Sequence, residues 1–276
     1  MCQLLGMNCA VPADITFSFT GFAARGGKTD HHGDGFGIGF FEGNACRLLI
    51  DTQPSSVSPM ADLIKRYPIK STNVIAHIRK ATHGAVNLEN CHPFMLELWG
   101  RHWLFAHNGN LRDYRPSNLS VYRPIGSTDS ENAFCALLEK MREYSPDEQP
   151  PLDELFRMVE GFVREVNKEG TFNFLLSNGQ VLFAHCSTRL QYLIRQWPFS
   201  QARLIDADLE MDFSRTNGEN DRIAVIATTP LTQNENWTSF EPGELLMFSQ
   251  GLPVLRTLIP IPEDVQKRNA EDRSYV

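Results

Sequence analysis

The sequence predicts an α+β domain in which two β-sheets pack against each other and helices cover their outer faces. Strand-like segments occupy the N-terminal part as far as Ala106, two amphipathic helices follow, and strand-like segments return after Gly170. Because a sheet and an amphipathic helix each have an apolar face to bury, this order favours paired sheets with helices outside them. The apolar periodicity of each segment identifies its type.

In the N-terminal part the clearest signal is a β-hairpin. Segments 36–41 and 46–50 flank Gly43-Asn44, a pair of turn residues. A short helix is predicted at 59–66, because Ser58 can cap its N-terminus and proline suits its first position. Two apolar runs are predicted as buried strands: 73–78 and 103–106.

The middle of the chain carries the two helices. Thr128 and Glu131 form a capping-box pattern, so the first helix is predicted to begin there. Both helices have apolar residues at helical spacing. The first face comprises Ala133, Phe134, Leu137, Leu138 and Met141, and the second Leu152, Leu155, Phe156, Val159, Phe162, Val163 and Val166.

The C-terminal part returns to strands. Segments 172–177 and 181–185 flank Asn178-Gly179, a dipeptide typical of a two-residue hairpin turn. The polar stretch 206–221 is predicted to be irregular surface. Further strands are predicted at 223–227, 244–248 and 254–258.

Length and composition limit the kind of protein. We expect a single domain over 2–260 and a C-terminal tail over 261–276. The net charge of -7 and the lack of a basic run argue against a nucleic-acid partner, and no apolar stretch is long enough for a membrane span. Six scattered cysteines and no secretory signal favour the reducing cytoplasm. No cofactor is implied, and His31-His32 lacks the further ligands that a metal site needs.

Cys2 is the most informative residue. If Met1 is removed, Cys2 carries a thiol and a free α-amine together. A thiol reacts as thiolate, and an α-amine titrates near pH ~8, so one residue would supply both nucleophile and base. The alternative is structural, since cysteine is commonly buried and the next residues resemble a core strand.

Three further clusters offer polar chemistry, and each has a plainer explanation. Arg79 and Thr82 lie at a strand end, where a guanidinium can clamp a carboxylate, although a surface arginine fits as well. Asn108-Gly109 would suit an oxyanion hole or an ordinary turn. Asp129 would hold an ammonium group or simply complement a helix dipole. Together they describe a site for an amino acid with a side-chain amide.

These motifs resemble those of class II glutamine amidotransferases, which are N-terminal-nucleophile hydrolases with an αββα sandwich of antiparallel sheets. The similarity extends over most of the chain and is greatest to the stand-alone, YafJ-like branch. The motifs that carry it are Met1-Cys2, Ala76-His77-Ile78-Arg79-x-x-Thr82-His83-Gly84, Asn90-x-His92-Pro93 and His107-Asn108-Gly109, in this order.

The resemblance implies a role for each site residue. Cys2 would attack the side-chain amide of glutamine, forming a γ-glutamyl thioester and releasing ammonia, and water would then release glutamate. Asn108 and Gly109 would stabilise the oxyanion. Arg79, helped by Thr82 and His83, would bind the α-carboxylate. Asp129 would bind the ammonium group. His77, His92 and His107 are interpreted as structural.

Two positions depart from the family pattern and leave the substrate open. Lys80 stands where an aromatic residue is common, and Gln3 where glycine is frequent. Hydrolysis of other γ-glutamyl amides is therefore an alternative to glutamine hydrolysis. A non-catalytic binding or regulatory module on the same scaffold is a third hypothesis. The family also suggests a separate synthase that would accept the ammonia.

Overall fold

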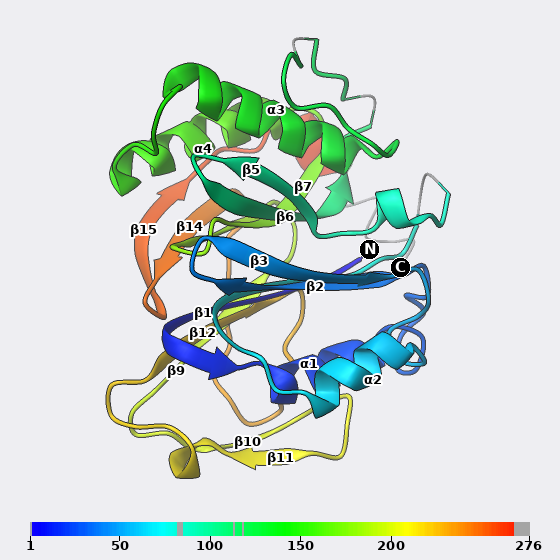
Figure 1. The fold of residues 1–276 in the computed structure, drawn as a ribbon, viewed down its shortest axis with the longest axis vertical. Helices are drawn as coiled ribbons and strands as arrows, with labels where there is room; N and C mark the ends of the chain where they lie inside the picture. The colour runs from blue at the N-terminus through cyan, green and yellow to red at the C-terminus, as the bar shows by residue number, and fades with distance from the viewer. Residues whose placement is uncertain (1, 82–84, 113, 118, 268–276) are drawn as a thin grey trace.

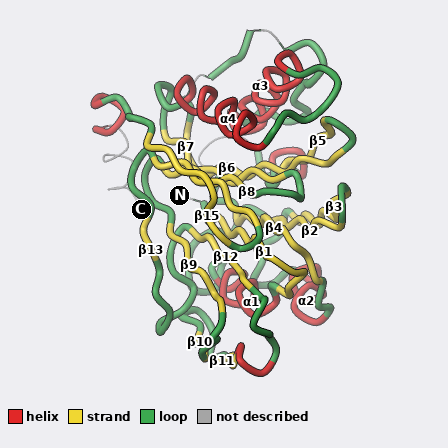
Figure 2. The backbone as a smooth tube through the Cα atoms, turned by 90° about the vertical axis from the view of Figure 1, so that its left-hand side faces the viewer, coloured by secondary structure: helices red, strands yellow, loops and turns green. Residues whose placement is uncertain are grey.

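Two antiparallel sheets stack face to face, and a pair of helices covers the outer face of each (Figures 1 and 2). This computed structural model describes residues 2–81, 85–112, 114–117 and 119–267. The layers follow the order helix, sheet, sheet, helix, so the predicted αββα architecture is confirmed. No helix among the described residues has the length and apolar character to cross a bilayer.

The lower sheet in Figure 1 has seven strands, in the order β13-β9-β12-β1-β4-β2-β3. Its strands are β1 (Gln3–Asp14), β2 (Phe36–Glu42), β3 (Ala45–Asp51), β4 (Lys70–Ile78), β9 (Gln191–Gln196), β12 (Arg222–Ala227) and β13 (Thr238–Ser239). Helices α1 (Thr16–Ala24) and α2 (Pro59–Arg66) pack on its outer face through a shared apolar cluster.

The upper sheet has six strands, in the order β15-β14-β8-β7-β6-β5. They are β5 (Phe94–Leu98), β6 (Arg101–Asn110), β7 (Thr171–Ser177), β8 (Leu182–Cys186), β14 (Glu244–Ser249) and β15 (Leu252–Leu258). Helices α3 (Asp129–Tyr144) and α4 (Leu152–Val166) cover it. Outside both sheets lie a small ribbon, β10 (Gln201–Arg203) with β11 (Glu210–Asp212), and two 3-10 turns, Leu88–Asn90 and Phe213–Arg215.

Apolar side chains of both inner faces fill the space between the sheets. Leu4 and Ile75 of the lower sheet meet Leu104, Leu175 and Leu246 of the upper one, and all are almost fully buried. This layer brings the start of β1, the end of β4 and the end of β6 close together. The residues just before β1 and just after β4 therefore lie close to the end of β6.

Most predicted elements are confirmed. The hairpins of β2 with β3 and of β7 with β8 are present, and Gly179 adopts a φ of 84° in the second turn. Ser177 pairs with Leu182, so this turn has four residues instead of the predicted two. Helix α2 has the predicted bounds, and the Ser58 hydroxyl accepts the N–H groups of Met60 and Ala61. Both long helices form, and their predicted apolar faces are buried apart from Leu152, which is partly buried.

Two expectations need correction, and one helix was not predicted. Thr128 caps α3 by accepting the N–H of Glu131, but the Glu131 carboxylate accepts from Ile125 and Gly126, so the reciprocal half of the capping box is absent. The stretch 206–221 is not wholly irregular, because it contains β11 and a 3-10 turn with Phe213 buried. Helix α1 was not predicted, since seven of its nine residues are buried and it lacks a polar face.

A second carboxylate of α3 holds the long segment between β6 and α3. The side chain of Glu139 is 3% exposed and accepts the N–H groups of Ser120, Val121 and Tyr122 at 3.2, 2.9 and 3.1 Å. Arg142 forms an ion pair with it. Because three consecutive backbone N–H groups share one carboxylate, this segment is fixed against the helix.

Glu139→Gln is expected to reduce stability in a pH-dependent way. Burial alone would raise the pKa of Glu139, but hydrogen bonds from Arg142, Ser120 and the backbone lower it from 4.5 to about 2. The carboxylate therefore stabilises the fold fully above pH 4.5, and this contribution disappears as the pH falls towards 2. Urea unfolding should show a loss of about 1–2 kcal/mol at neutral pH that shrinks in acid. Glu143→Gln, on the exposed face of α3, is the control, and an equal loss at every pH would contradict the prediction.

Candidate functional site

A cavity of about 580 Å³ lies where the strand ends meet the start of α3. Cys2, Arg79, Gly109 and Asp129 all line it. Cys2 precedes β1, Arg79 follows β4, Gly109 belongs to β6, and Asp129 is the first residue of α3. Four residues that the sequence predicts as site residues, from distant parts of the chain, thus share one cavity.

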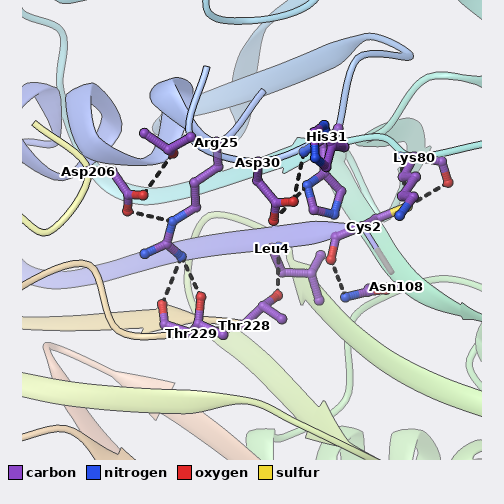
Figure 3. A network of polar contacts seen from close by, with 12 residues as sticks. Cys2, Leu4, Arg25, Asp30, His31, Lys80, Asn108, Asp206, Thr228 and Thr229 are labelled. Atoms are coloured by element: carbon purple, nitrogen blue, oxygen red, sulfur yellow. Dashed lines mark hydrogen bonds and ion pairs between the residues drawn. The ribbon is translucent and has the colours of Figure 1, made fainter. Parts of the chain in front are cut away.

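The pairing of β1 with β4 sets the position of Cys2. Gln3 lies opposite Ile78 in this antiparallel pair, so the residue before β1 faces the residues after β4. The backbone N–H of Lys80 donates to the Cys2 sulfur at 3.2 Å, and the thiol in turn lies 3.4 Å from the Lys80 carbonyl oxygen (Figure 3). The thiol is therefore held at the edge of the sheet by backbone contacts.

The thiol of Cys2 is not strongly acidic in this setting. Burial raises its pKa, while the hydrogen bond from the Lys80 backbone and the charge of Arg79 act in the opposite direction. Since the net shift is upward, the protonated thiol dominates at neutral pH. A reaction at this sulfur requires a base that removes the proton.

Asn108 lies directly beneath Cys2. Its side-chain amide donates to the Cys2 carbonyl oxygen at 2.5 Å (Figure 3), and its own backbone carbonyl accepts from the amide of Asn173 at 2.9 Å. An amide nitrogen carries two hydrogens, so the bond to Cys2 leaves one donor for another oxygen. Asn173, which the sequence did not single out, also anchors the backbone N–H groups of Ser187 and Thr188.

Gly109 has no room for a side chain. A Cβ placed there would lie 1.9 Å from the Thr171 carbonyl oxygen and 2.5 Å from Nε2 of His107. Glycine is therefore required by the close approach of β6 to β7. Its backbone borders the cavity, as an oxyanion donor must.

Arg79 is a buried cation at the end of β4. It is 4% exposed, and its guanidinium donates to the Ala85 carbonyl oxygen at 3.0 Å. The Arg79 backbone is tied to the Asp34-Gly35 turn through its N–H and its carbonyl oxygen. The Asp34 carboxylate also accepts the N–H of Ala81 at 2.7 Å. The Asp34-Gly35 turn therefore fixes the strand end that carries Arg79.

Asp129 combines a structural role with a place in the cavity wall. One carboxylate oxygen accepts the N–H of Leu111 at 2.6 Å, and the other accepts the N–H of Ser130 at 2.8 Å. Asp129 therefore also has a structural role, because it holds the backbone at Leu111 and at Ser130 in the first turn of α3. Asp129 and Arg79 line the same cavity, and the two charges could bind the two ends of a zwitterion.

Thr82 and His83, which the sequence predicts to help Arg79, lie outside the described residues. Several residues that the sequence did not predict as catalytic or substrate-binding residues also border the cavity. These are Lys80, Ala81, His92, His107, Asn110, Arg112, Arg115, Ser127, Thr128 and Ser130. Arg112 and Arg115 belong to an irregular segment, so no periodicity marks them as site residues.

The histidines near the site are neutral. Burial lowers the pKa of His77 to about 3 and also lowers the pKa values of His92 and His107. His107 bridges β7 and α3, with Nε2 at 3.0 Å from the Thr171 carbonyl oxygen and Nδ1 at 2.8 Å from the Ser130 hydroxyl. This agrees with the bracing role expected for His107. The rings of His77 and His92 pack 4.3 Å apart.

The comparisons with known proteins agree with this geometry. A family model described as class-II glutamine amidotransferases matches residues 1–273. A Haemophilus influenzae protein with a provisional glutamine amidotransferase name is 51% identical over 251 residues, which cover 91% of this chain and 85% of the relative. YafJ of Escherichia coli, also named provisionally, is 49% identical over 251 residues, or 91% and 98% of the two chains.

Solved structures give the same result. The crystal structure of a predicted glutamine amidotransferase from Pseudomonas aeruginosa has a TM-score of 0.74 at 43% identity, over 92% of this chain and 100% of that one. A glutamine phosphoribosylpyrophosphate amidotransferase from B. subtilis has a TM-score of 0.58 at 15% identity, over 95% and 50% of the chains, and shows similarity of fold alone. From the family match and its extent, the chain belongs to the class II glutamine amidotransferases.

Proposed function

We propose that the chain is an amidohydrolase that uses Cys2 to hydrolyse the side-chain amide of glutamine. The observation that carries this proposal is the shared cavity, which brings a thiol, a buried cation, a carboxylate and a glycine backbone together. Free glutamine carries an α-carboxylate, an α-ammonium group and an amide, and each of these has a counterpart in the cavity wall.

The binding mode follows from the charges. Arg79 would hold the α-carboxylate through its planar guanidinium, with Thr82 and His83 as further proposed contacts. Asp129 would hold the α-ammonium group. The side chain of glutamine would then extend towards Cys2, with its amide oxygen between Asn108 and the backbone of Gly109.

Met1 would be removed once, before any catalysis, and its removal would free the α-amine of Cys2. This amine takes the proton of the thiol, and the sulfur attacks the amide carbon, so a C–S bond forms and the oxyanion is stabilised by Asn108 and Gly109. The amine then returns the proton to the leaving nitrogen, the C–N bond breaks and ammonia departs. Water attacks the thioester in the same way, the C–S bond breaks, and glutamate and the free thiol are restored.

Ammonia would pass to a separate acceptor protein or be released, and a cytoplasmic location would keep the thiol reduced. The test is to incubate the purified protein with glutamine and to measure glutamate and ammonia in equal amounts. Mass spectrometry of the same sample should show Cys2 as the first residue. Glutamate release by protein that retains Met1 would exclude the α-amine as the base.

Asp129→Asn is expected to raise KM for glutamine about tenfold or more and to change kcat much less. The amide keeps one oxygen, which can accept from either the Leu111 or the Ser130 N–H group, and it loses the charge-assisted bond to the substrate ammonium. Steady-state kinetics provide the measurement. Asp153→Asn, an acid in the first turn of α4, is the matched control. An unchanged KM would leave Asp129 with its structural role alone.

A further inference from the structure

The peptide unit between Asn108 and Gly109 links the two donors of the proposed oxyanion site. The Asn108 side chain already binds the Cys2 carbonyl oxygen, and Gly109 borders the cavity. This peptide is trans, so it is planar and its C=O and N–H groups point in opposite directions. The direction of the Gly109 N–H is therefore set by the contacts that hold the Asn108 carbonyl oxygen.

Asn173 of β7 holds that carbonyl oxygen. Its side-chain amide donates to it at 2.9 Å, and the two asparagines lie opposite each other in the β6–β7 ladder. On the other side of β6 the ladder with β5 ends at the Phe94–Phe105 pair, before it reaches Asn108. Because glycine tolerates more than one orientation of the peptide before it, this added bond constrains the peptide unit where one neighbouring strand is lost.

The side chain of Asn173 has a single suitable orientation. It is fully buried, and its oxygen accepts the N–H groups of Ser187 and Thr188 at 2.9 Å each. Its nitrogen donates to the Thr188 hydroxyl at 2.8 Å as well as to Asn108. All four hydrogen-bonding positions of the amide are thus used. Exchange of its oxygen and nitrogen would place donor against donor and acceptor against acceptor, so the nitrogen must face Asn108.

The same bond strengthens the Gly109 N–H as a donor. A hydrogen bond accepted by a peptide carbonyl polarises the whole peptide unit, and hydrogen bonds in a chain reinforce one another. Asn108 and Asn173 are both almost fully buried, so water screens this effect little. Negative charge that develops on an oxygen in the cavity would therefore meet an N–H that is both aimed and polarised.

We propose that Asn173 is a positioning residue for the oxyanion site. It is not among the described residues that line the cavity, and it acts through the Asn108-Gly109 peptide. This inference rests on the proposed function, because an oxyanion forms only if Cys2 attacks an amide carbonyl. Its kinetic signature is a loss of transition-state stabilisation without a loss of substrate binding.

Asn173→Leu roughly keeps the size of the side chain and removes all of its hydrogen bonds. We expect kcat for glutamine to fall at least about tenfold, and up to the ~10²-fold that a misplacement of about 1 Å can cost, with little change in KM. Alkylation of Cys2 by iodoacetamide, followed by mass spectrometry, should keep its rate, because this reaction forms no oxyanion. Thr188→Val removes the other acceptor of the same amide nitrogen and is the matched control. It should keep kcat within about threefold.

A second measurement reads the peptide unit directly and does not depend on activity. Labelling asparagine carbonyl carbons with ¹³C and glycine nitrogens with ¹⁵N selects the Asn-Gly pairs of the sequence, which are Asn108-Gly109, Asn178-Gly179 and Asn217-Gly218. A hydrogen bond to a carbonyl withdraws electron density from the nitrogen of the same peptide. Asn173→Leu should therefore move the Gly109 nitrogen signal upfield, while the other two signals stay and serve as internal controls.

If leucine prevents folding beside the two freed backbone N–H groups, Asn173→Ala leaves room for water there and undergoes the same tests. A kcat within about threefold of the unmodified protein in the folded variant would overturn the inference. An unmoved Gly109 signal, or alkylation of Cys2 that slows as much as kcat, would overturn it too. If the unmodified protein releases no glutamate that depends on Cys2, the proposed function fails and the inference fails with it. If it does, and the Asn173 variant behaves like it, only the inference is wrong.

Discussion

Cys2→Ala is expected to abolish glutamate release, with a fall in kcat of at least about 10⁴-fold, because Cys2 carries the one thiol among the described residues that line the cavity. The side chain is small and lies at a strand end, so the fold should be retained. Coupled measurement of glutamate gives the rate, and mass spectrometry of protein quenched with glutamine should show a γ-glutamyl adduct that the variant lacks.

The control is Cys46→Ala, at a partly buried cysteine in β3. A second variant carries one additional residue immediately N-terminal to Cys2, and this residue cannot be cleaved off. This keeps the thiol but converts the α-amine to an amide, and we expect a loss nearly as large, because the raised pKa of the thiol leaves it dependent on a base. Activity in the Cys2→Ala variant would disprove the catalytic assignment, and activity in the extended protein would move the base elsewhere.

Asn108→Ala is expected to lower kcat by about 10²–10³-fold with little change in KM, the usual cost of one oxyanion donor. The effect has two physical sources. The amide would donate to the oxyanion in the transition state, and in the resting structure it already binds the Cys2 carbonyl oxygen. Both contacts depend on the side-chain N–H groups.

Asn108→Asp separates these donors from side-chain size, since it keeps the shape and removes the N–H groups. It should be at least as slow as the alanine variant. Asn217→Ala, in a peripheral loop where the amide contacts Asp221, serves as the control. A kcat within threefold of the unmodified protein would leave Asn108 with a packing role only.

Local sequence signals predicted the elements whose stability is local. Ser58 before Pro59 and the dipeptide Asn178-Gly179 each fix backbone geometry within a few residues, so helix α2 and the β7–β8 hairpin could be predicted. Helix α1 depends instead on its surroundings. It is buried on nearly all sides, and a segment without a polar face has no helical period in its sequence.

The site shows the same division. The structure places Cys2, Arg79, Gly109 and Asp129 around one cavity, while Asn108 donates to the Cys2 carbonyl oxygen and is not among the described residues that line it. Motif order pointed to all five of these residues. It could not reveal Asn173, because an asparagine in a buried strand has no motif and acts only through partners distant in sequence.

The antiparallel ladder between β1 and β4 also acts as a ruler for the start of the chain. Gln3 is fixed opposite Ile78, and the following pairs keep that register as far as Asn8. Inserting one residue after Cys2 would push the thiol one position beyond the strand end and turn it to the other face of the sheet. Strand pairing thus sets the position of the N-terminal residue at which catalysis is proposed.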